Sequence, residues 1–409
     1  MTVEQRFPAG APIAVESLLD EVTAEPVGGR LGVGDPRIRD FLVAFARRLL
    51  APTVARRFPE LASLGFFLRR GEIDRILESA GTPQGQLRFP RGLVFHVPPA
   101  NVDTIFVYSW ALSALAGNPN VVRISSRSAG AADAILDALN DTLASAHPAI
   151  AGTQRMITYG HDDAVTAVLS AHCDLRVIWG GDESVTRIRR HPLPPSARDL
   201  TFPDRSSFTV VSASGWLAAD DAARRDVVVG FYNDAYWFDQ AACASPRAVY
   251  WVGDPAGVDE ARVDFVERLS AEVTRRVPRV DAAMAVEQRV STYGLAAEGV
   301  ATAVRFAGHA LATVDLAEPG QIPRRWLGAG TFPQARVDTL TDLVDVVRRR
   351  DQTVTHFGFT EAELVAFARA LAGRGVDRLV PIGEALTFSS VWDGYDLLRE
   401  FTRLVTVRS

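Results

Sequence analysis

The sequence predicts an α/β protein with two doubly wound lobes and a helical N-terminal lead-in, on three observations. Its 409 residues exceed the roughly 250 to 300 at which a single core stops growing, so more than one lobe is expected. From Gly92 onward, short apolar runs alternate with helical patterns, which is typical of a parallel sheet covered by helices. The same alternation resumes after the proline-rich polar stretch 191–205, which indicates a second lobe.

Residues 1–85 are expected to form a helical lead-in packed on the first lobe. Apolar residues recur with helical spacing over 37–50 and 61–77, and loops containing Gly and Pro separate these stretches. The first lobe, residues 86–203, contains four strand–helix units, whose expected strands are GLVFHV, VVRI, RMITY and DLRVIW.

The second lobe is expected over residues 204–384. The strand SFTVVS, a helix over 217–231 and the strand RAVYWV resume the alternation. Further helical patterns cover 258–275, 282–294, 340–350 and 361–371. Residues 385–409 are expected to return to the first lobe or to a dimer interface, with YDLLREFTRLV as an amphipathic helix.

Composition excludes several classes of function. All 44 Lys+Arg residues are Arg, so the chain has neither a Schiff-base lysine nor a G-K-[ST] phosphate loop. The net charge of −5 argues against binding nucleic acid. The best apolar run, Ile105 to Leu115, is far shorter than a membrane span of about 20 residues. None of the seven His forms a metal-ligand pair, and the start lacks a signal-peptide pattern, so we expect a cytoplasmic protein without a metal.

Two features concern a cofactor and a nucleophile. Gly180 and Gly181 follow an expected strand and precede a helix, where backbone can approach a cofactor closely, although simple turn chemistry also explains them. No G-x-G-x-x-G motif occurs. Cys243 lies among small residues before Pro246, which favours a turn with an accessible sulfur. A buried core position is the alternative for Cys243, and it is the preferred interpretation for Cys173.

A third feature is Asn101, which follows an expected strand at the start of a helix. A fixed amide donor beside a nucleophile stabilises the oxyanion of a tetrahedral intermediate. Asn also favours turns and helix caps in any protein, so both interpretations stay open here.

These residues occur in segments that resemble the acyl-CoA reductase family typified by the LuxC subunit of bacterial fatty acid reductases, within the aldehyde dehydrogenase superfamily. The resemblance covers roughly residues 65 to 409 and implies an aldehyde-dehydrogenase-like fold. The segments that carry it are PRGLVFHVPPANVDT (90–104), ALAGNPNVVRISSRS (114–128), VIWGGDESVTRIR (177–189), DRSSFTVV (204–211), DQAACASPRAVYWV (239–252) and VWDGYDLL (391–398).

The resemblance implies roles for individual residues. Cys243 would take the acyl group from a thioester, and Asn101, with the backbone N–H of Cys243, would hold the oxyanion. Arg123 stands where the superfamily usually has a lysine that contacts the adenosine ribose, and Arg there suits the 2′-phosphate of NADPH, with NADH as the alternative. Ser125 and the pair Gly180 and Gly181 would also lie against the cofactor.

The chain departs from the superfamily at two further points. PDRSSFTVV carries no Glu where hydrolytic aldehyde dehydrogenases have their water activator, which suits a reductase. AGTFPQARV (329–337) is a poor match to the E-x-F-G-P motif, so that contact is unassigned. His96 and His356 are candidates for acid–base work near the thiol, with a structural role as the alternative for His96.

The predicted activity is reduction of an acyl thioester to an aldehyde through a cysteine acyl-enzyme. The alternatives are an NAD(P)-dependent aldehyde dehydrogenase, a cofactor-free cysteine acyltransferase and a non-catalytic scaffold. The expected substrate is an acyl-CoA or an acyl-carrier-protein thioester. The resemblance further implies a homo-dimer or tetramer and an acyl-activating partner protein.

Overall fold

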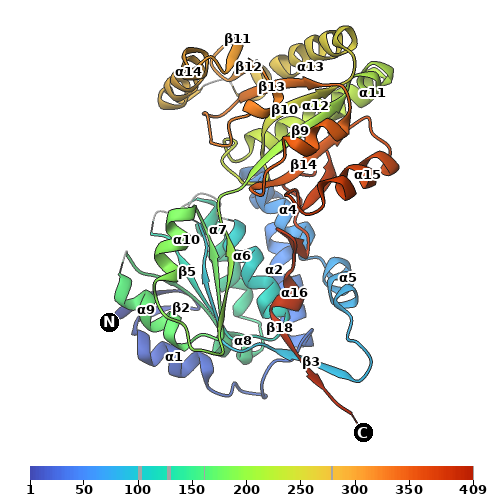
Figure 1. Ribbon diagram of the computed structural model, residues 1–409. Coiled ribbons are helices and arrows are strands. Elements are labelled where there is room, and N and C mark those ends of the chain that lie inside the picture. Colours follow the sequence, from blue (N-terminus) through green and yellow to red (C-terminus); the bar gives the residue numbers. More distant parts are fainter. Residues whose placement is uncertain (100–103, 127–129, 161, 278–279, 409) are drawn as a thin grey trace. The chain divides into compact units, whose positions relative to one another are not determined.

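The computed structural model describes residues 1–409 except 100–103, 127–129, 161, 278–279 and 409. The chain forms two compact units, one of residues 1–203 and 388–409 and the other of residues 204–387. Each unit is built on its own seven-stranded sheet with helices on it, as Figure 1 shows. The predicted α/β class is therefore confirmed. Both sheets are mixed, since each also contains antiparallel strands.

The first unit consists of the elements from β1 to β8 and, at the C-terminal end of the chain, those from β16 to β18. Its elements are β1 (Thr2–Phe7), β2 (Ala9–Ala14), α1 (Val15–Thr23), α2 (Pro36–Leu49), α3 (Pro52–Arg57), α4 (Pro59–Phe67), α5 (Arg70–Ala80), β3 (Gln86–Pro90), β4 (Val94–Val97), α6 (Thr104–Leu115), β5 (Asn120–Ile124), α7 (Ala131–Leu143), α8 (Pro148–Thr153), β6 (Gln154–Thr158), α9 (Asp163–His172), β7 (Leu175–Trp179), α10 (Asp182–Arg189), β8 (Arg198–Phe202), β16 (Val391–Trp392), β17 (Tyr395–Asp396), α16 (Leu397–Glu400) and β18 (Thr402–Thr406).

The sheet of the first unit has the order β2-β1-β6-β5-β4-β7-β8, and the five strands from β6 to β8 are parallel. The chain runs outward from β4 to β6 on one side and from β7 to β8 on the other, so the strand order reverses between β4 and β7. Helices α1, α9 and α10 pack on one face through a shared apolar core. In open α/β sheets, ligands bind beyond the carboxyl ends of the strands at such a reversal.

The expected helical lead-in is wrong at its start. β1 and β2 form a hairpin, and β1 adds to the sheet antiparallel to β6. Val3 and Phe7 are buried, whereas Glu4 between them is exposed. Six residues with so weak an alternation do not identify a strand by themselves, because strand formation depends on the partner strands, which here are β2 and β6.

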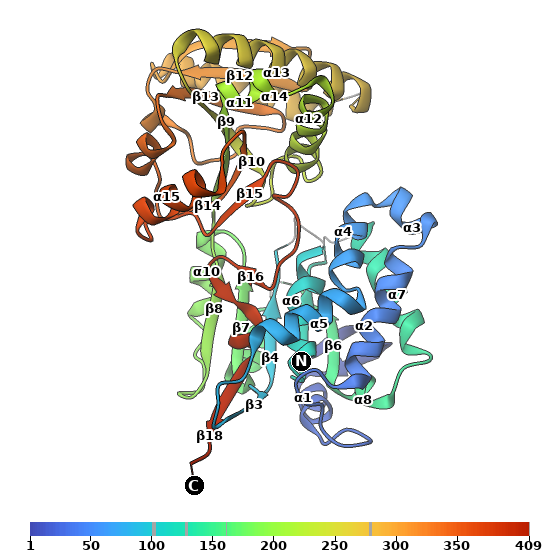
Figure 2. The same ribbon diagram turned by 90° about the vertical axis from the view of Figure 1, so that its right-hand side faces the viewer.

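The expected C-terminal amphipathic helix is also wrong. Only α16 is helical there, and β18 pairs antiparallel with β3 in a separate two-stranded sheet, which Figure 2 shows near the C-terminus. Side chains of the first unit donate hydrogen bonds to the backbone carbonyls of residues 400–402. Arg91 donates to the carbonyls of Glu400 and Thr402, and Asn118 Nδ2 donates to the Phe401 carbonyl at 2.9 Å. These bonds replace the hydrogen bonds that a longer helix would form.

The second unit alternates strands and helices in the same way. Its elements are β9 (Ser206–Ser212), α11 (Ala213–Ala218), α12 (Asp221–Tyr236), β10 (Pro246–Val252), α13 (Pro255–Arg276), α14 (Ala282–Ala297), β11 (Ala301–Ala307), β12 (Leu311–Leu316), the 3₁₀ helix η1 (Pro319–Gln321), β13 (Thr331–Val337), the 3₁₀ helix η2 (Leu340–Asp345), β14 (Asp351–Phe357), α15 (Glu361–Leu371) and β15 (Arg378–Pro381).

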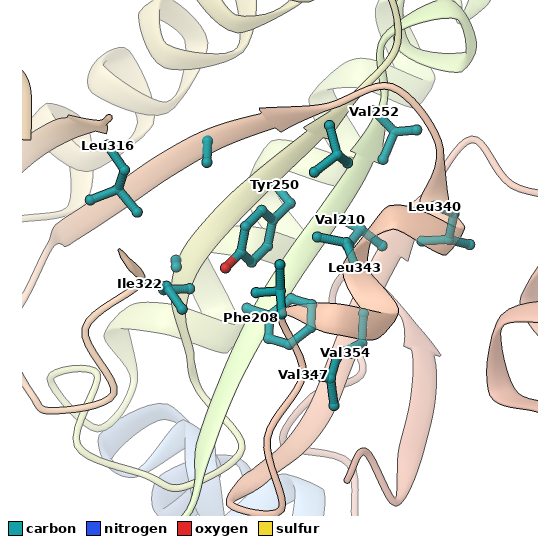
Figure 3. Close-up of a cluster of buried hydrophobic side chains, with 14 of the residues drawn as sticks. Phe208, Val210, Tyr250, Val252, Leu316, Ile322, Leu340, Leu343, Val347 and Val354 are labelled. Carbon is teal, nitrogen blue, oxygen red and sulfur yellow. The ribbon is translucent and has the colours of Figure 1, made fainter. Parts of the chain in front are cut away.

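The second sheet has the order β11-β12-β13-β10-β9-β14-β15, with β11–β12 as its antiparallel pair. Figure 3 shows the apolar core on one of its faces, where Phe208 and Tyr250 of the central strands meet side chains of η2. The α-helix expected over 340–350 is wrong. Leu340, Leu343 and Val346 are buried at a spacing of three residues, which is the period of a 3₁₀ helix.

Asn118 offers a test of how the C-terminal segment is held. Its buried amide accepts from the backbone N–H groups of Arg91 and Gly92 and donates to the Phe401 carbonyl. Asn118→Ala is expected to lower the free energy of unfolding by about 3 kcal/mol, because it leaves buried polar groups unpaired. Urea denaturation measures that loss, and amide hydrogen exchange should rise over residues 402–406. Gln84→Ala, in an exposed loop, is the control; equal exchange in both variants would contradict the assignment.

Candidate functional site

The turn that carries Cys243 joins α12 to β10. Asp239 and Gln240 both adopt left-handed backbone conformations, with φ of 50° and 60°. Such conformations cost energy for residues other than glycine and persist where surrounding contacts impose them. Gln240 supplies these contacts: its side chain is 2% exposed, Nε2 donates to the carbonyls of Pro246 and Thr331, and Oε1 accepts from the Thr331 N–H. The turn is therefore fastened to the starts of β10 and β13.

A second contact fastens Cys243 itself. Ser207 Oγ, at the start of β9, donates to the Cys243 carbonyl at 2.7 Å and accepts from the Thr353 N–H of β14 at 3.1 Å. The cysteine backbone thus lies at the amino-terminal edge of three adjacent central strands, β10, β9 and β14. Pro246 begins β10 and ends the turn, as the sequence predicted.

The two cysteines have different environments. Cys243 is half-buried on its turn. Cys173 is 1% exposed, its sulfur contacts the Ser170 carbonyl, and burial raises the pKa of its thiol to about 12. The core interpretation of Cys173 therefore agrees with its position, whereas Cys243 has the partial exposure that a nucleophile requires.

The structure does not bring His356 to Cys243. In the parallel register, His356 is level with Val210 and Tyr250, while the Cys243 turn precedes Pro246, which is level with Ser207. These levels are three residues apart along β9 and four along β10, which is roughly 10 to 13 Å at about 3.3 Å for each residue. Burial lowers the pKa of His356, which disfavours the charged form of its imidazole. This position does not support the expected acid–base role at the thiol.

His96 lies in the core of the first unit. Its Nδ1 bonds to Ser109 Oγ and its Nε2 to Asn120 Oδ1, both at 2.9 Å. Burial lowers the pKa of His96 to about 4. Asn120 in turn donates to Gln154 Oε1, which also accepts from Trp110 Nε1. Because both ring nitrogens are engaged in this network, the structural alternative for His96 accounts for its surroundings.

The expected cofactor residues share the carboxyl edge of the first sheet. Arg123 lies near the end of β5 and Ser125 just beyond it, and Gly180 and Gly181 lie between β7 and α10. The Arg123 guanidinium stacks over the Tyr159 ring at 4.9 Å, and Nη2 donates to the Gly160 carbonyl at 3.3 Å. Its Nε is buried without a hydrogen-bond partner. Asn101 lies outside the described residues.

Within the described parts of the chain, no helix is long and apolar enough to cross a membrane. The same residues contain no group of three or more His, Cys, Asp and Glu side chains placed to hold a metal ion.

Comparison with known proteins identifies the family. The model of the acyl-CoA reductase (LuxC) family matches residues 73–404. The chain belongs to the LuxC acyl-CoA reductase family. This confirms the resemblance deduced from the sequence motifs.

Curated relatives of this LuxC-family protein are long-chain acyl-protein thioester reductases. The one from Vibrio harveyi is 26% identical over 330 residues, which cover 79% of this chain and 65% of the relative. The one from Photorhabdus luminescens is 24% identical over 327 residues, which cover 78% of this chain and 63% of the relative. The matched part of the chain thus spans less than two thirds of the length of these relatives.

Solved structures show the fold of the LuxC-family chain. A putative aldehyde dehydrogenase from Burkholderia cenocepacia matches with a TM-score of 0.66 at 15% identity, covering 100% of this chain and 95% of that one. Aldehyde dehydrogenase 21 from Physcomitrella patens matches with a TM-score of 0.68 at 11% identity, with the same coverage. The aldehyde-dehydrogenase-like fold is confirmed.

Three residues around Cys243 were not singled out from the sequence. Gln240 and Arg247 stand in the cysteine motif itself, and Ser207 stands in the neighbouring DRSSFTVV segment. Proximity to Cys243 in the motif was a signal for the first two. Ser207 had no such signal, since its link to Cys243 spans 36 residues and arises from the pairing of β9 with β10.

The contrast between the two thiols predicts selective alkylation. Iodoacetamide at pH 7.5 should modify Cys243 in the folded LuxC-family protein and leave Cys173 unmodified, since burial and the raised pKa both suppress the Cys173 thiolate. Peptide mass spectrometry measures each site. In urea both cysteines should react, which is the control. Rapid modification of Cys173 in the folded protein would contradict the assignment.

Proposed function

We propose that this protein reduces an acyl thioester to an aldehyde, with NADPH as the hydride donor and Cys243 as the nucleophile. One observation carries the proposal: a half-buried cysteine on a strained turn, fastened by Gln240 and Ser207, in a chain of the acyl-CoA reductase family. Restraint of this kind reduces the entropy lost when a substrate carbonyl meets the sulfur.

The proposed acyl transfer uses residues of the chain alone. The Cys243 thiolate attacks the thioester carbonyl, and the carbon–sulfur bond to the departing thiol breaks. We assign the oxyanion to the side chain of Asn101 and the backbone N–H of Cys243, as the family resemblance implies. The overall balance is one thioester, one NADPH and one proton giving one aldehyde, one thiol and NADP⁺.

The acyl-enzyme must survive until it is reduced. Hydrolysis requires a base to activate water, and the segment before β9 and along it, PDRSSFTVVS, contains no Glu. Ser207 in this segment donates a hydrogen bond to the Cys243 carbonyl, and its hydroxyl is not a carboxylate base. This composition favours reduction over the acid-forming dehydrogenase that is the main alternative. A thiol released with each aldehyde, without free acid, would distinguish the two.

Residues of the first unit fit a nicotinamide dinucleotide. The sheet reverses its strand order between β4 and β7, where such ligands bind. The fixed guanidinium of Arg123, with a buried Nε that has no partner in the protein, suits a ribose or a 2′-phosphate. Ser125, Gly180 and Gly181 would line the same edge. When bound, NADPH supplies the hydride that takes the acyl group to the aldehyde level.

We propose a protein-bound long-chain acyl thioester as the substrate class, because the curated relatives are named for it. Acyl-CoA is the alternative donor. An acyl-activating partner and a homo-oligomeric state remain predictions from the family resemblance.

The reaction is tested by following NADPH oxidation and aldehyde formation with long-chain acyl-CoA and with the same acyl group on a carrier protein. Cys243→Ser should abolish turnover. Asn101→Ala should reduce it about 10²- to 10³-fold, the cost of one oxyanion donor. Cys173→Ala is the control and should retain activity. Normal turnover by Cys243→Ser would overturn the proposed mechanism, and acylation of Cys243 without NADPH oxidation would indicate an acyltransferase.

Cofactor choice gives a separate prediction. Arg123→Ala should raise the KM for NADPH about 10- to 100-fold, as expected for loss of a charged hydrogen-bonding partner. The KM for NADH should change much less, since NADH lacks the 2′-phosphate, and NADH therefore serves as the internal control. Steady-state kinetics with both cofactors measure the two constants. Equal changes for both would show that Arg123 does not contact that phosphate.

A further inference from the structure

Arg247 has an unusual place beside the Cys243 turn. It follows Pro246 in β10 and is half-buried. Its Nη2 donates back to the Ala241 carbonyl of the turn, at the long distance of 3.4 Å. Its Nε is buried and has no hydrogen-bond partner. Within the described residues no carboxylate forms an ion pair with this guanidinium, although an arginine removed from water requires compensation by an opposite charge.

Other arginines in this unit show what the usual compensation is. Arg324 donates to both carboxylate oxygens of Asp351 at 2.8 and 2.9 Å, and Arg224 forms an ion pair with Asp264. Arg205 likewise pairs with Asp377. Arg247 differs from all three, because no carboxylate among the described residues forms an ion pair with its guanidinium.

The charged groups that face Arg247 come from three segments. Burial lowers the pKa of Arg247, and the charge of Arg350, just before β14, acts in the same direction. Cys243 on the turn and Asp204, before β9, act in the opposite direction, and Cys243 has the larger effect of the two. Asp239 is the carboxyl group of the turn itself, and burial raises its pKa. The geometry places the Arg247 guanidinium on the turn that carries Cys243, since its Nη2 bonds the carbonyl of Ala241, two residues before the cysteine.

We propose that Arg247 is a positioning residue that holds the Cys243 sulfur as a thiolate in the free enzyme. The interaction is reciprocal, so a thiolate that favours the charged guanidinium is favoured by it to the same extent. Arginine does not accept a proton near neutral pH, so the thiol proton goes to water and no general base is required for the attack. This inference rests on the proposed role of Cys243 as the nucleophile.

The positions of the two candidate histidines agree with a thiolate that is stabilised by Arg247 without a general base. His356 lies about four residues of strand away from the turn, and His96 has both ring nitrogens bonded in the core of the other unit. Register thus separates His356 from the turn, and the ring of His96 is already fully engaged by Ser109 and Asn120. Since the chain contains no lysine, an arginine is the side chain that supplies a permanent positive charge here.

The test measures the ionisation of Cys243 directly and needs no substrate. In a Cys173→Ala background, the rate of iodoacetamide alkylation is followed from pH 5 to 10 by intact-protein mass. The parent should show a midpoint well below the value of about 8.5 for an ordinary cysteine. Arg247→Gln should raise this midpoint by about one pH unit, which slows alkylation about tenfold at pH values well below both midpoints. Arg247→Lys should largely restore the parent profile, because the charge is retained.

Arg336→Gln is the matched control. It removes an arginine from β13, the neighbour of β10, at the level of Trp251 and therefore toward the carboxyl ends of the strands, away from the Cys243 turn. This change should leave the midpoint unchanged. An unchanged midpoint in folded Arg247→Gln, with circular dichroism as in the parent, would overturn the proposal. If that variant does not fold, Arg247→Met keeps the apolar stem and replaces it. A parent midpoint at or above about 8.5 would overturn the proposal without any variant.

Reductase turnover is measured separately, so the two proposals fail in different ways. A shifted midpoint together with no NADPH oxidation by any acyl thioester would leave Arg247 in its role and remove the proposed function. If turnover depends on Cys243 but Arg247→Gln does not move the midpoint, the proposed function stands and the role of Arg247 is overturned. A merely structural role of Arg247 would change stability but not the pH midpoint.

Discussion

The Gln240 side chain is the contact on which the geometry of the cysteine turn depends. It occupies a left-handed backbone position that Gln rarely adopts, and its three hydrogen bonds join the turn to the starts of β10 and β13. Ser207 adds a bond to the carbonyl of Cys243 from β9. A strained turn held by buried side chains has few alternative conformations, so the backbone of Cys243 is held in one arrangement.

The first unit uses the same kind of buried polar contact for another purpose. Asn118 joins the start of β4 to the carbonyl of Phe401, and so ties the C-terminal segment to the core. Asn120 and Gln154 continue the network and engage both His96 and Trp110. Fully paired networks of this kind specify one arrangement, because any other arrangement leaves buried groups without partners. Here the arrangement is one in which distant parts of the chain form a single unit.

Arginine performs different tasks in this lysine-free chain. Most buried arginines are neutralised by carboxylates, as Arg176 is by Asp199 at 2.7 and 3.0 Å. Arg123 is held by the Tyr159 ring and a carbonyl, which leaves its charge uncompensated at the expected cofactor edge. Arg247 lies beside Cys243 with no bonded carboxylate. Within the described part of the chain, Arg123 has no bonded carboxylate and suits an external anion, whereas the anion proposed for Arg247 is the Cys243 sulfur of the same chain.

The sequence by itself determined the fold class, the family and the positions of the motifs, because the buried parallel strands are continuous apolar runs and Cys243, Gly180 and Gly181 stand in recognisable segments. It did not determine β1, β18 or η2, since their conformations depend on pairing and capture by distant residues such as Asn118. It did not separate His356 from Cys243 either, because strand register decides that distance. Only the tertiary structure placed Ser207 and Gln240 around the turn and left Arg247 without a carboxylate. These are long-range contacts, for which local patterns carry no information.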